Sequence, residues 1–198
     1  MGWEDRGGLS SVGAMAVTVT PDQFTMVLFD AGAIRTWAEA LLARLDMADC
    51  NLHIEVDETT PIARVQSQVG DPIVVRAESG AFEDTRRPRH LSETAVNTAL
   101  GRTLLRARDR LSGGFDDAPA DRDLDLAQVA AWDTYAVGRL ARLGYPVHQP
   151  RWIYNFRNRH GFTDQADESF AEIWSADGLS WEELSALSGR AANATTSV

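Results

Sequence analysis

The spacing of apolar residues changes along the chain, and this change restricts the folds that the chain can adopt. Between Ile34 and Met47 the apolar residues recur every three or four positions, which predicts an amphipathic helix. From Leu52 to Asp57 apolar and polar residues alternate one by one, which is typical of a strand with one buried and one solvent-exposed face. The chain therefore combines helices with strands, and we expect an α+β fold.

Further strand signals follow closely. The segment 62–69 alternates more loosely, Gly70-Asp71-Pro72 is a turn signal, and the next three residues, 73–75, form a compact apolar run. Parallel strands need a connection of about a dozen residues or more, so these short joints predict a small antiparallel sheet of about three to four strands. A short β-prone run, 16–20, lies closer to the N-terminus.

The second half of the chain carries helix signals. Ser92 is a suitable N-cap for a long helix that ends at Gly113-Gly114, and a second long helix is predicted at 126–143. Two shorter helices are expected near 164–175 and 180–187. Three other segments lack this pattern. We expect a loop at 86–90, a disordered loop at 115–125 and an extended or irregular segment at 147–161.

These patterns predict one domain with a tail at each end. Residues 1–14 are expected to form a mobile tail, residues 15–190 a single α+β domain, and residues 191–198 a second tail. Within the domain we expect the sheet at about 50–78 and a mostly helical C-terminal half at about 91–188, with helices packed against the sheet.

Composition argues against several classes of protein. The chain has no stretch of about 18 apolar residues, so we expect no membrane-spanning helix. Its single cysteine, Cys50, excludes an internal disulfide framework. With 29 acidic and 19 basic residues the formal net charge is -10, which makes duplex DNA an unfavourable partner. We expect a bacterial, cytoplasmic protein.

Charge is distributed in bands. All 19 basic residues are arginine, whose planar guanidinium group suits carboxylate and phosphate. Residues 134–163 contain five arginines and no acid, whereas residues 164–183 contain seven acids and no base. Such bands are explained either by pairing between neighbouring elements or by a local anion-binding site on an otherwise acidic protein.

Three residues of metal-binding types share one face of the first predicted strand. The alternation places His53, Glu55 and Asp57 on its polar face, in steps of about 7 Å. Imidazole and carboxylate groups are ligands for zinc and other first-row divalent metals. A metal site is therefore one hypothesis. The other is that these residues only face solvent, as polar residues of an amphipathic strand do.

The run from Arg151 to His160 combines aromatic residues with arginines. If this run is extended, its three aromatic residues line one face. Aromatic rings can stack on bases while guanidinium groups bind phosphate. The candidate ligand-binding residues are Arg151, Trp152, Tyr154, Arg157, Arg159 and His160. The alternative is a strand at the edge of the core, with buried rings and with arginines that pair with the acidic final helices.

Asp133 is an acidic residue on an apolar stripe. In the helix predicted at 126–143 it shares the three-four spacing of the apolar residues. A buried carboxylate needs a partner, and Arg102, Arg106 or a hydroxyl near Tyr135 could supply it. Asp133 is interpreted either as a functional acid or as a structural contact between two helices.

Two functions follow from these features. The first is a binding or interaction protein that holds an anionic, phosphate-bearing ligand or an acidic protein partner on the arginine and aromatic surface. The second is a metal-assisted hydrolase that uses His53, Glu55 and Asp57. The chain contains no complete catalytic motif, which favours the first, although whether it is an enzyme stays open. No cofactor is predicted. A homo-oligomer is an open alternative, since its six tryptophans would suit an interface if two or more are exposed.

Overall fold

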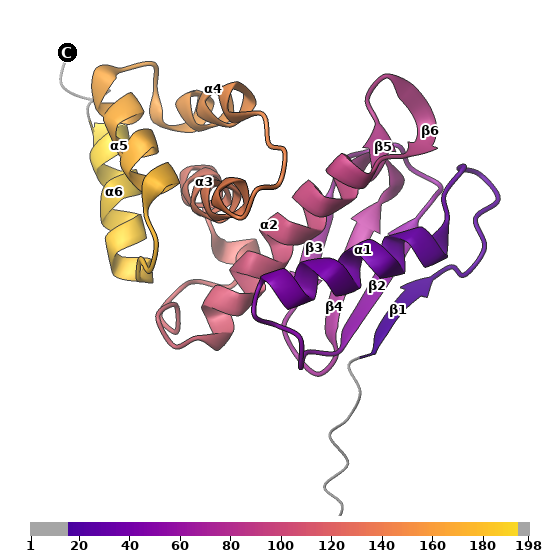
Figure 1. The fold of residues 1–198 in the computed structure, drawn as a ribbon. Helices are drawn as coiled ribbons and strands as arrows, with labels where there is room; N and C mark the ends of the chain where they lie inside the picture. The colour runs from indigo at the N-terminus through magenta and orange to yellow at the C-terminus, as the bar shows by residue number, and fades with distance from the viewer. Residues whose placement is uncertain (1–15, 194–198) are drawn as a thin grey trace, which may run out of the picture.

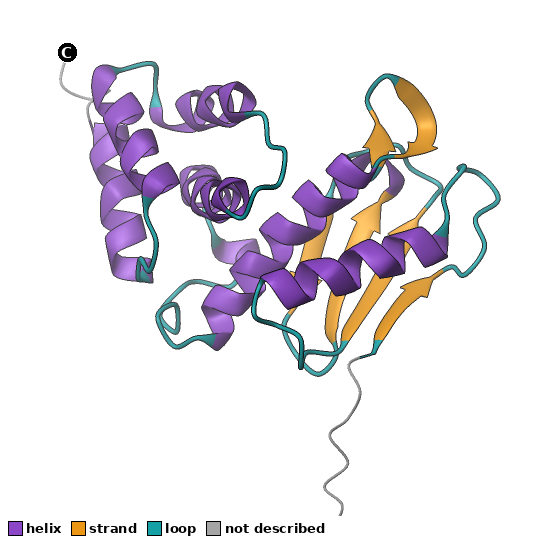
Figure 2. Ribbon diagram, in the orientation of Figure 1, coloured by secondary structure: helices purple, strands orange, loops and turns teal. Residues whose placement is uncertain are grey.

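The structure is a computed structural model that describes residues 16–193. It contains a sheet-rich N-terminal half and a helical C-terminal half, which confirms the α+β class (Figures 1 and 2). The strands are β1 (Val17–Thr20), β2 (Leu52–Asp57), β3 (Val65–Gln68), β4 (Ile73–Glu78), β5 (Glu83–Asp84) and β6 (Arg87–Leu91). The helices are α1 (Ala31–Arg44), α2 (Glu93–Leu111), α3 (Leu126–Arg142), α4 (Gln149–His160), α5 (Asp164–Ser175) and α6 (Trp181–Asn193), with short 3-10 helices η1 (Ser79–Ala81) and η2 (Asp121–Asp123).

The main sheet is mixed, and the expectation of an antiparallel sheet is wrong for most of it. The strand order is β1-β2-β4-β3, in which β1, β2 and β4 are parallel and only β3 is antiparallel to its neighbour. Helix α1 connects β1 to β2, and residues 58–72, which include β3, connect β2 to β4. Both connections are long enough for parallel pairing. The error came from pairing strands in sequence order, whereas β3 lies outside β4.

Helices α1 and α2 cover one face of the main sheet (Figure 1). The buried apolar residues of β2 and β4 point toward these helices and form the first core, which includes Leu52, Ile54 and Val75. The alternate residues of both strands are half-buried or exposed on the opposite face. Each helix begins at an N-cap: Asp30 accepts hydrogen bonds from two amides of α1, and Ser92 caps α2, as predicted.

Helices α3 to α6 enclose a second core. Its large buried side chains include Trp132 and Tyr135 of α3, Phe156 of α4 and Phe170 of α5. Helix α3 also contributes to the first core, through residues one and two turns further along, 136 and 140. Because one helix serves both cores, it joins the two halves of the molecule. None of the helices within residues 16–193 combines the length and the apolar character that a bilayer crossing requires.

The segment expected to be extended or irregular at 147–161 is mostly helix α4. Pro150 lies in the first turn, where a helix tolerates proline, and Gly161 ends the helix with a φ of 101°. Phe156 and His160, one turn apart, are its buried residues. The alternating aromatic residues indicated a strand. Trp152, Phe156 and His160 also match a helical spacing of four, and these three residues pack into or against the second core.

Two other segments also differ from expectation. Residues 87–91, expected to be a loop, form strand β6, which pairs with β5 in a separate hairpin. The loop 115–125, expected to be disordered, packs against the second core. Phe115 is buried and stacks on Trp132 with ring centroids 4.8 Å apart. The predicted tail at 1–14 lies outside the described residues. Helix α6 continues to Asn193, into the tail predicted at 191–198, and the rest of that tail is outside the described range.

Candidate functional site

Strand β2 places His53, Glu55 and Asp57 on the face of the sheet that points away from the helices. Each of these groups has its own partner. His53 Nδ1 lies 2.7 Å from the hydroxyl of Thr18, and Glu55 accepts a 2.6 Å hydrogen bond from Nε of Arg76. Asp57 accepts hydrogen bonds from the hydroxyl and the amide of the residue two positions later, 59, and these bonds lower the pKa of its carboxyl group.

These three side chains do not converge on a common point. The contact between His53 and Glu55 is 3.6 Å, from Nε2 to Oε1, while Asp57 turns back to its own loop. Within residues 16–193 no group of three or more His, Cys, Asp and Glu side chains is arranged to hold a metal ion. The geometry therefore provides no observation that favours the metal-assisted hydrolase.

The outer face of α4 combines arginine with exposed aromatic rings. Arg151, Tyr154, Asn158 and Arg159 are all exposed, Tyr154 to 59%. Just beyond the helix, Phe162 is 64% exposed, and its ring meets that of Tyr154 edge to face with centroids 6.0 Å apart. Neither arginine has a side-chain partner among residues 16–193. We call these five residues the α4 face.

The other residues of the predicted site point elsewhere. Trp152 is half-buried against the second core, and His160 is buried. Arg157 donates two hydrogen bonds to Asp167 of α5, at 2.6 and 2.5 Å, and these bonds lower the pKa of the Asp167 carboxyl group. Both interpretations of the run are therefore represented: three of the six candidate ligand-binding residues face solvent, and the other three pack or form an ion pair.

His160 connects α4 to α6. Its Nδ1 lies 3.0 Å from the carbonyl oxygen of Phe156, and its Nε2 lies 2.8 Å from the hydroxyl of Ser188. A carbonyl oxygen can only accept, so Nδ1 carries the proton and Nε2 accepts from Ser188. Burial lowers the pKa of this imidazole, which stays neutral near pH 7.

A pocket of about 330 Å³ lies at the C-terminal end of α4, next to the α4 face. Its lining residues are Arg157, Asn158, Arg159, His160, Gly161, Phe162 and Ala192. Three of the predicted ligand-binding residues therefore line one pocket. Phe162 belongs to both the pocket and the α4 face. It was not among the residues predicted from the sequence, because it follows Gly161 and is part of no periodic pattern.

Asp133 is bound by both arginines that the sequence offered as partners. Its two carboxylate oxygens accept hydrogen bonds from Arg102 at 2.6 Å and from Arg106 at 3.0 Å, and this pairing is confirmed. Arg106 also reaches Asp121 at 3.1 Å, as does Arg110 at 2.7 Å. The result is a row of alternating arginines and aspartates between α2, α3 and the loop that precedes α3.

A second ion pair between these helices was not predicted. Arg139 of α3 binds the carboxylate of Asp109 of α2 with two hydrogen bonds of 2.7 Å, and both side chains are buried. The indole N–H of Trp132 donates to the same carboxylate at 2.7 Å. In the sequence Asp109 stands between two arginines, a pattern typical of a solvated helix face, so no local signal indicates its burial.

The tryptophans that the structure describes form no exposed interface. Each of those that the structure describes is buried or half-buried: Trp37, Trp132, Trp152, Trp174 and Trp181. The condition that we set for a dimer interface built on exposed tryptophan is therefore not met within residues 16–193.

Fold and surface together define an α+β protein that presents a cationic, aromatic helix face. Comparisons of the chain with protein-family models, with curated protein sequences and with solved structures find no match.

Proposed function

We propose that this protein is an interaction module that binds an acidic segment of a protein partner on the α4 face. The observation that carries this proposal is the contact between the exposed rings of Tyr154 and Phe162 on the α4 face. Both arginines of that face lack a side-chain partner within residues 16–193. Tyrosine, phenylalanine and arginine are enriched at the centres of protein interfaces, where lysine and acids are depleted.

Charge supports an acidic partner. The protein as a whole has a net charge of -10, but residues 134–163 contain no acid. The α4 face is thus a cationic patch on an acidic molecule, and it would attract a segment of opposite charge.

The spacing of the arginines favours an extended acidic segment over a single phosphate group. Arg151 and Arg159 are eight positions apart on one helix, or about 12 Å along its axis at 1.5 Å per residue. One phosphate would contact both guanidinium groups only if the two side chains bent toward each other. Two carboxylates of a partner segment can contact one guanidinium group each without such bending, while apolar side chains of the segment cover the two rings.

The test uses a fluorescein-labelled peptide in which glutamates alternate with leucines and tryptophans, and a labelled pyrimidine oligonucleotide of equal length. We expect the peptide to bind, and the double variant Arg151→Gln/Arg159→Gln to weaken binding about tenfold, which corresponds to 1.4 kcal/mol. Fluorescence anisotropy at low ionic strength measures both dissociation constants.

The matched control is Arg35→Gln/Arg86→Gln, which removes the same charge from exposed arginines of α1 and of the loop before β6. Equal weakening by the control and the test variant would show that only net charge matters, and would overturn the proposal. Tighter binding of the oligonucleotide than of the peptide would also overturn it, and would assign the α4 face to nucleic acid.

A further inference from the structure

A second arginine site lies on the other side of α3, away from the α4 face. It is a pocket of about 260 Å³ between α2, the edge strand β3 and the loop that precedes α3. Its lining residues are Ser67, Val69, Arg106, Ala107, Arg110, Ala120 and Asp121. This volume lies below the roughly 300–1,000 Å³ typical of pockets for drug-sized ligands, so the pocket suits a small ligand.

Two guanidinium groups are held in place at this pocket. Arg106 and Arg110 lie one helical turn apart on α2, and both lie over the ring of Trp132, at 4.7 and 4.8 Å from its centroid. Arg106 is also bound by Asp133 at 3.0 Å, and Arg110 by the carbonyl oxygen of Pro119 at 2.7 Å. Because the protein already orders both side chains, binding an anion costs them little conformational entropy.

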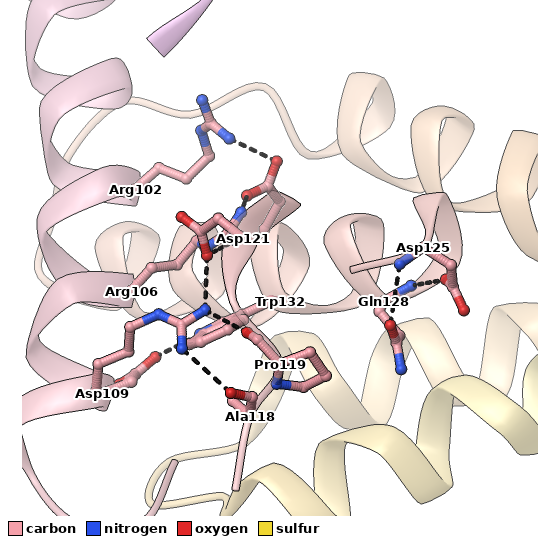
Figure 3. Close-up of polar contacts among 11 residues, drawn as sticks. Arg102, Arg106, Asp109, Ala118, Pro119, Asp121, Asp125, Gln128 and Trp132 are labelled. Carbon is pink, nitrogen blue, oxygen red and sulfur yellow. Dashed lines mark hydrogen bonds and ion pairs between the residues drawn. The ribbon is translucent and has the colours of Figure 1, made fainter. Parts of the chain in front are cut away.

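One carboxylate oxygen already occupies the position between the two guanidinium groups. Oδ1 of Asp121 accepts a hydrogen bond from Arg106 at 3.1 Å (Figure 3) and another from Arg110 at 2.7 Å. The two arginine side chains are only 12% and 21% exposed, whereas that of Asp121 is 44% exposed. Asp121 belongs to η2, a surface turn with no buried residue, so it can leave without opening a core.

The net charge of the cluster favours an anion with more negative charge than one carboxylate. Arg102, Arg106 and Arg110 carry three positive charges against two negative charges on Asp121 and Asp133, a balance of +1 that becomes +2 when Asp121 leaves. A phosphate monoester carries about two negative charges at pH 7 and three acceptor oxygens. The hydroxyl of Ser67 also lines the pocket and has no hydrogen bond within residues 16–193.

We propose that this pocket binds a phosphate monoester, whose oxygens replace the Asp121 carboxylate between Arg106 and Arg110. Asp121 then acts as an internal ligand that keeps the site closed until the phosphate displaces it. Paired arginine forks are the side chains that best match phosphate oxygens. This site is independent of the α4 face, since the two share no residue.

The experiment compares the wild-type protein with Asp121→Ala by isothermal titration with inorganic phosphate at low ionic strength. Removing the internal competitor should tighten phosphate binding about tenfold. The control is Asp123→Ala, which removes an equal charge from the same turn. Among residues 16–193, Asp123 pairs only with the exposed Arg122. The added substitution Arg110→Gln should abolish the gain. Equal phosphate affinity of the Asp121 and Asp123 variants would overturn the proposal.

A second measurement needs no substitution and remains informative if a variant fails to fold. In the wild-type protein, phosphate should shift the Nε–H nuclear magnetic resonance signals of Arg106 and Arg110 and leave that of Arg35 unchanged. Uniform shifts of all arginine signals would contradict a specific site. Titrations with ribose 5-phosphate and with a short phosphoserine peptide then distinguish a small metabolite from a phosphorylated segment, by which of the two binds more tightly.

Discussion

The ion pair between Asp109 and Arg139 is the most buried charged contact of the molecule's described part. Bringing two charges out of water is costly, and the cost is offset here by several hydrogen bonds to one carboxylate. The ring of Tyr135 lies 3.8 Å from the Arg139 guanidinium carbon and adds a cation–π contact. This pair sets how α2 and α3 meet, because neither group can leave the other without remaining buried and unpaired.

His160 offers a pH test at the scale of one residue. Burial lowers the pKa of its imidazole, although the carbonyl of Phe156 and the charge of Asp125 act in the opposite direction. In the unfolded chain a histidine titrates near pH 6.5. Below that pH the unfolded state therefore binds more protons than the folded state, and the free energy of unfolding falls as pH decreases toward the folded-state pKa.

We therefore expect the stability difference between wild type and His160→Gln to narrow as pH falls from 7.5 to about 5. Urea unfolding at several pH values measures it, with His148→Gln, an exposed histidine before α4, as the matched control. A difference that widens at low pH would mean that the folded imidazole is charged and stabilised by Asp125.

Single residues were predictable where they violated a pattern. Asp133 could be found because a carboxylate on an apolar stripe needs a partner, and the preceding helix had arginines at suitable positions. Asp109 and Asp121 could not be found, because among charged neighbours nothing distinguishes a buried acid from a solvated one. Their roles depend on which surfaces meet, and the chain's local spacing does not contain that information.

At the scale of elements, the packing of α3 against α5 depends on Gly138. A Cβ atom at this position would lie 2.2 Å from the carbonyl oxygen of Trp174, a backbone atom of α5 that cannot move aside. Arg142, one turn later, donates to that same carbonyl at 2.5 Å. The two helices therefore approach closely because glycine leaves space between them.

The substitution Gly138→Ala should lower the free energy of unfolding by about 1–3 kcal/mol, the usual cost of overpacking. The matched control is Gly189→Ala in α6, where nothing lies within 4 Å of the added atom and the residue is exposed. That control should raise stability by about 0.5–1 kcal/mol, because alanine favours a helix over glycine. Urea unfolding measures both, and a neutral Gly138→Ala would contradict the close approach.

Helix and strand positions were more predictable than their arrangement. Caps and apolar stripes indicated α2 and α3 almost to their ends. Strand order in the main sheet was not predictable from short joints, because β3 lies outside β4 and lets β2 and β4 pair in parallel. Helix α4 was misjudged because its rings satisfy spacings of both two and four, and only the second core decides between them.

At the scale of the whole molecule, α3 joins two cores that would otherwise be separate. Its residues Ala131 and Trp132 belong to the second core, whereas Ala136 and Leu140 belong to the first. Gly101 of α2 lies directly under the Leu140 side chain, so α3 and α2 fit closely. Neither half can lose its structure without exposing part of the other.

We therefore expect one cooperative unfolding transition. Of the described tryptophans, only Trp37 packs against the first core, so tryptophan fluorescence reports mainly on the helical half, while far-ultraviolet circular dichroism reports on both halves. The two signals should change at the same urea concentration. The same should hold in a Trp37→Phe variant, in which every remaining tryptophan within residues 16–193 packs in or against the second core. Two separate midpoints would show that the halves unfold independently.

The shared helix also has a consequence for synthesis on the ribosome. The sheet and its two covering helices are complete by residue 111, but the apolar surface of α2 that receives Ala136 and Leu140 has no cover at that stage. In the nascent chain this apolar surface of α2 therefore stays exposed to water, or is bound by a chaperone, until α3 has left the exit tunnel. The first core is thus completed only when α3, a helix of the second half, packs onto it.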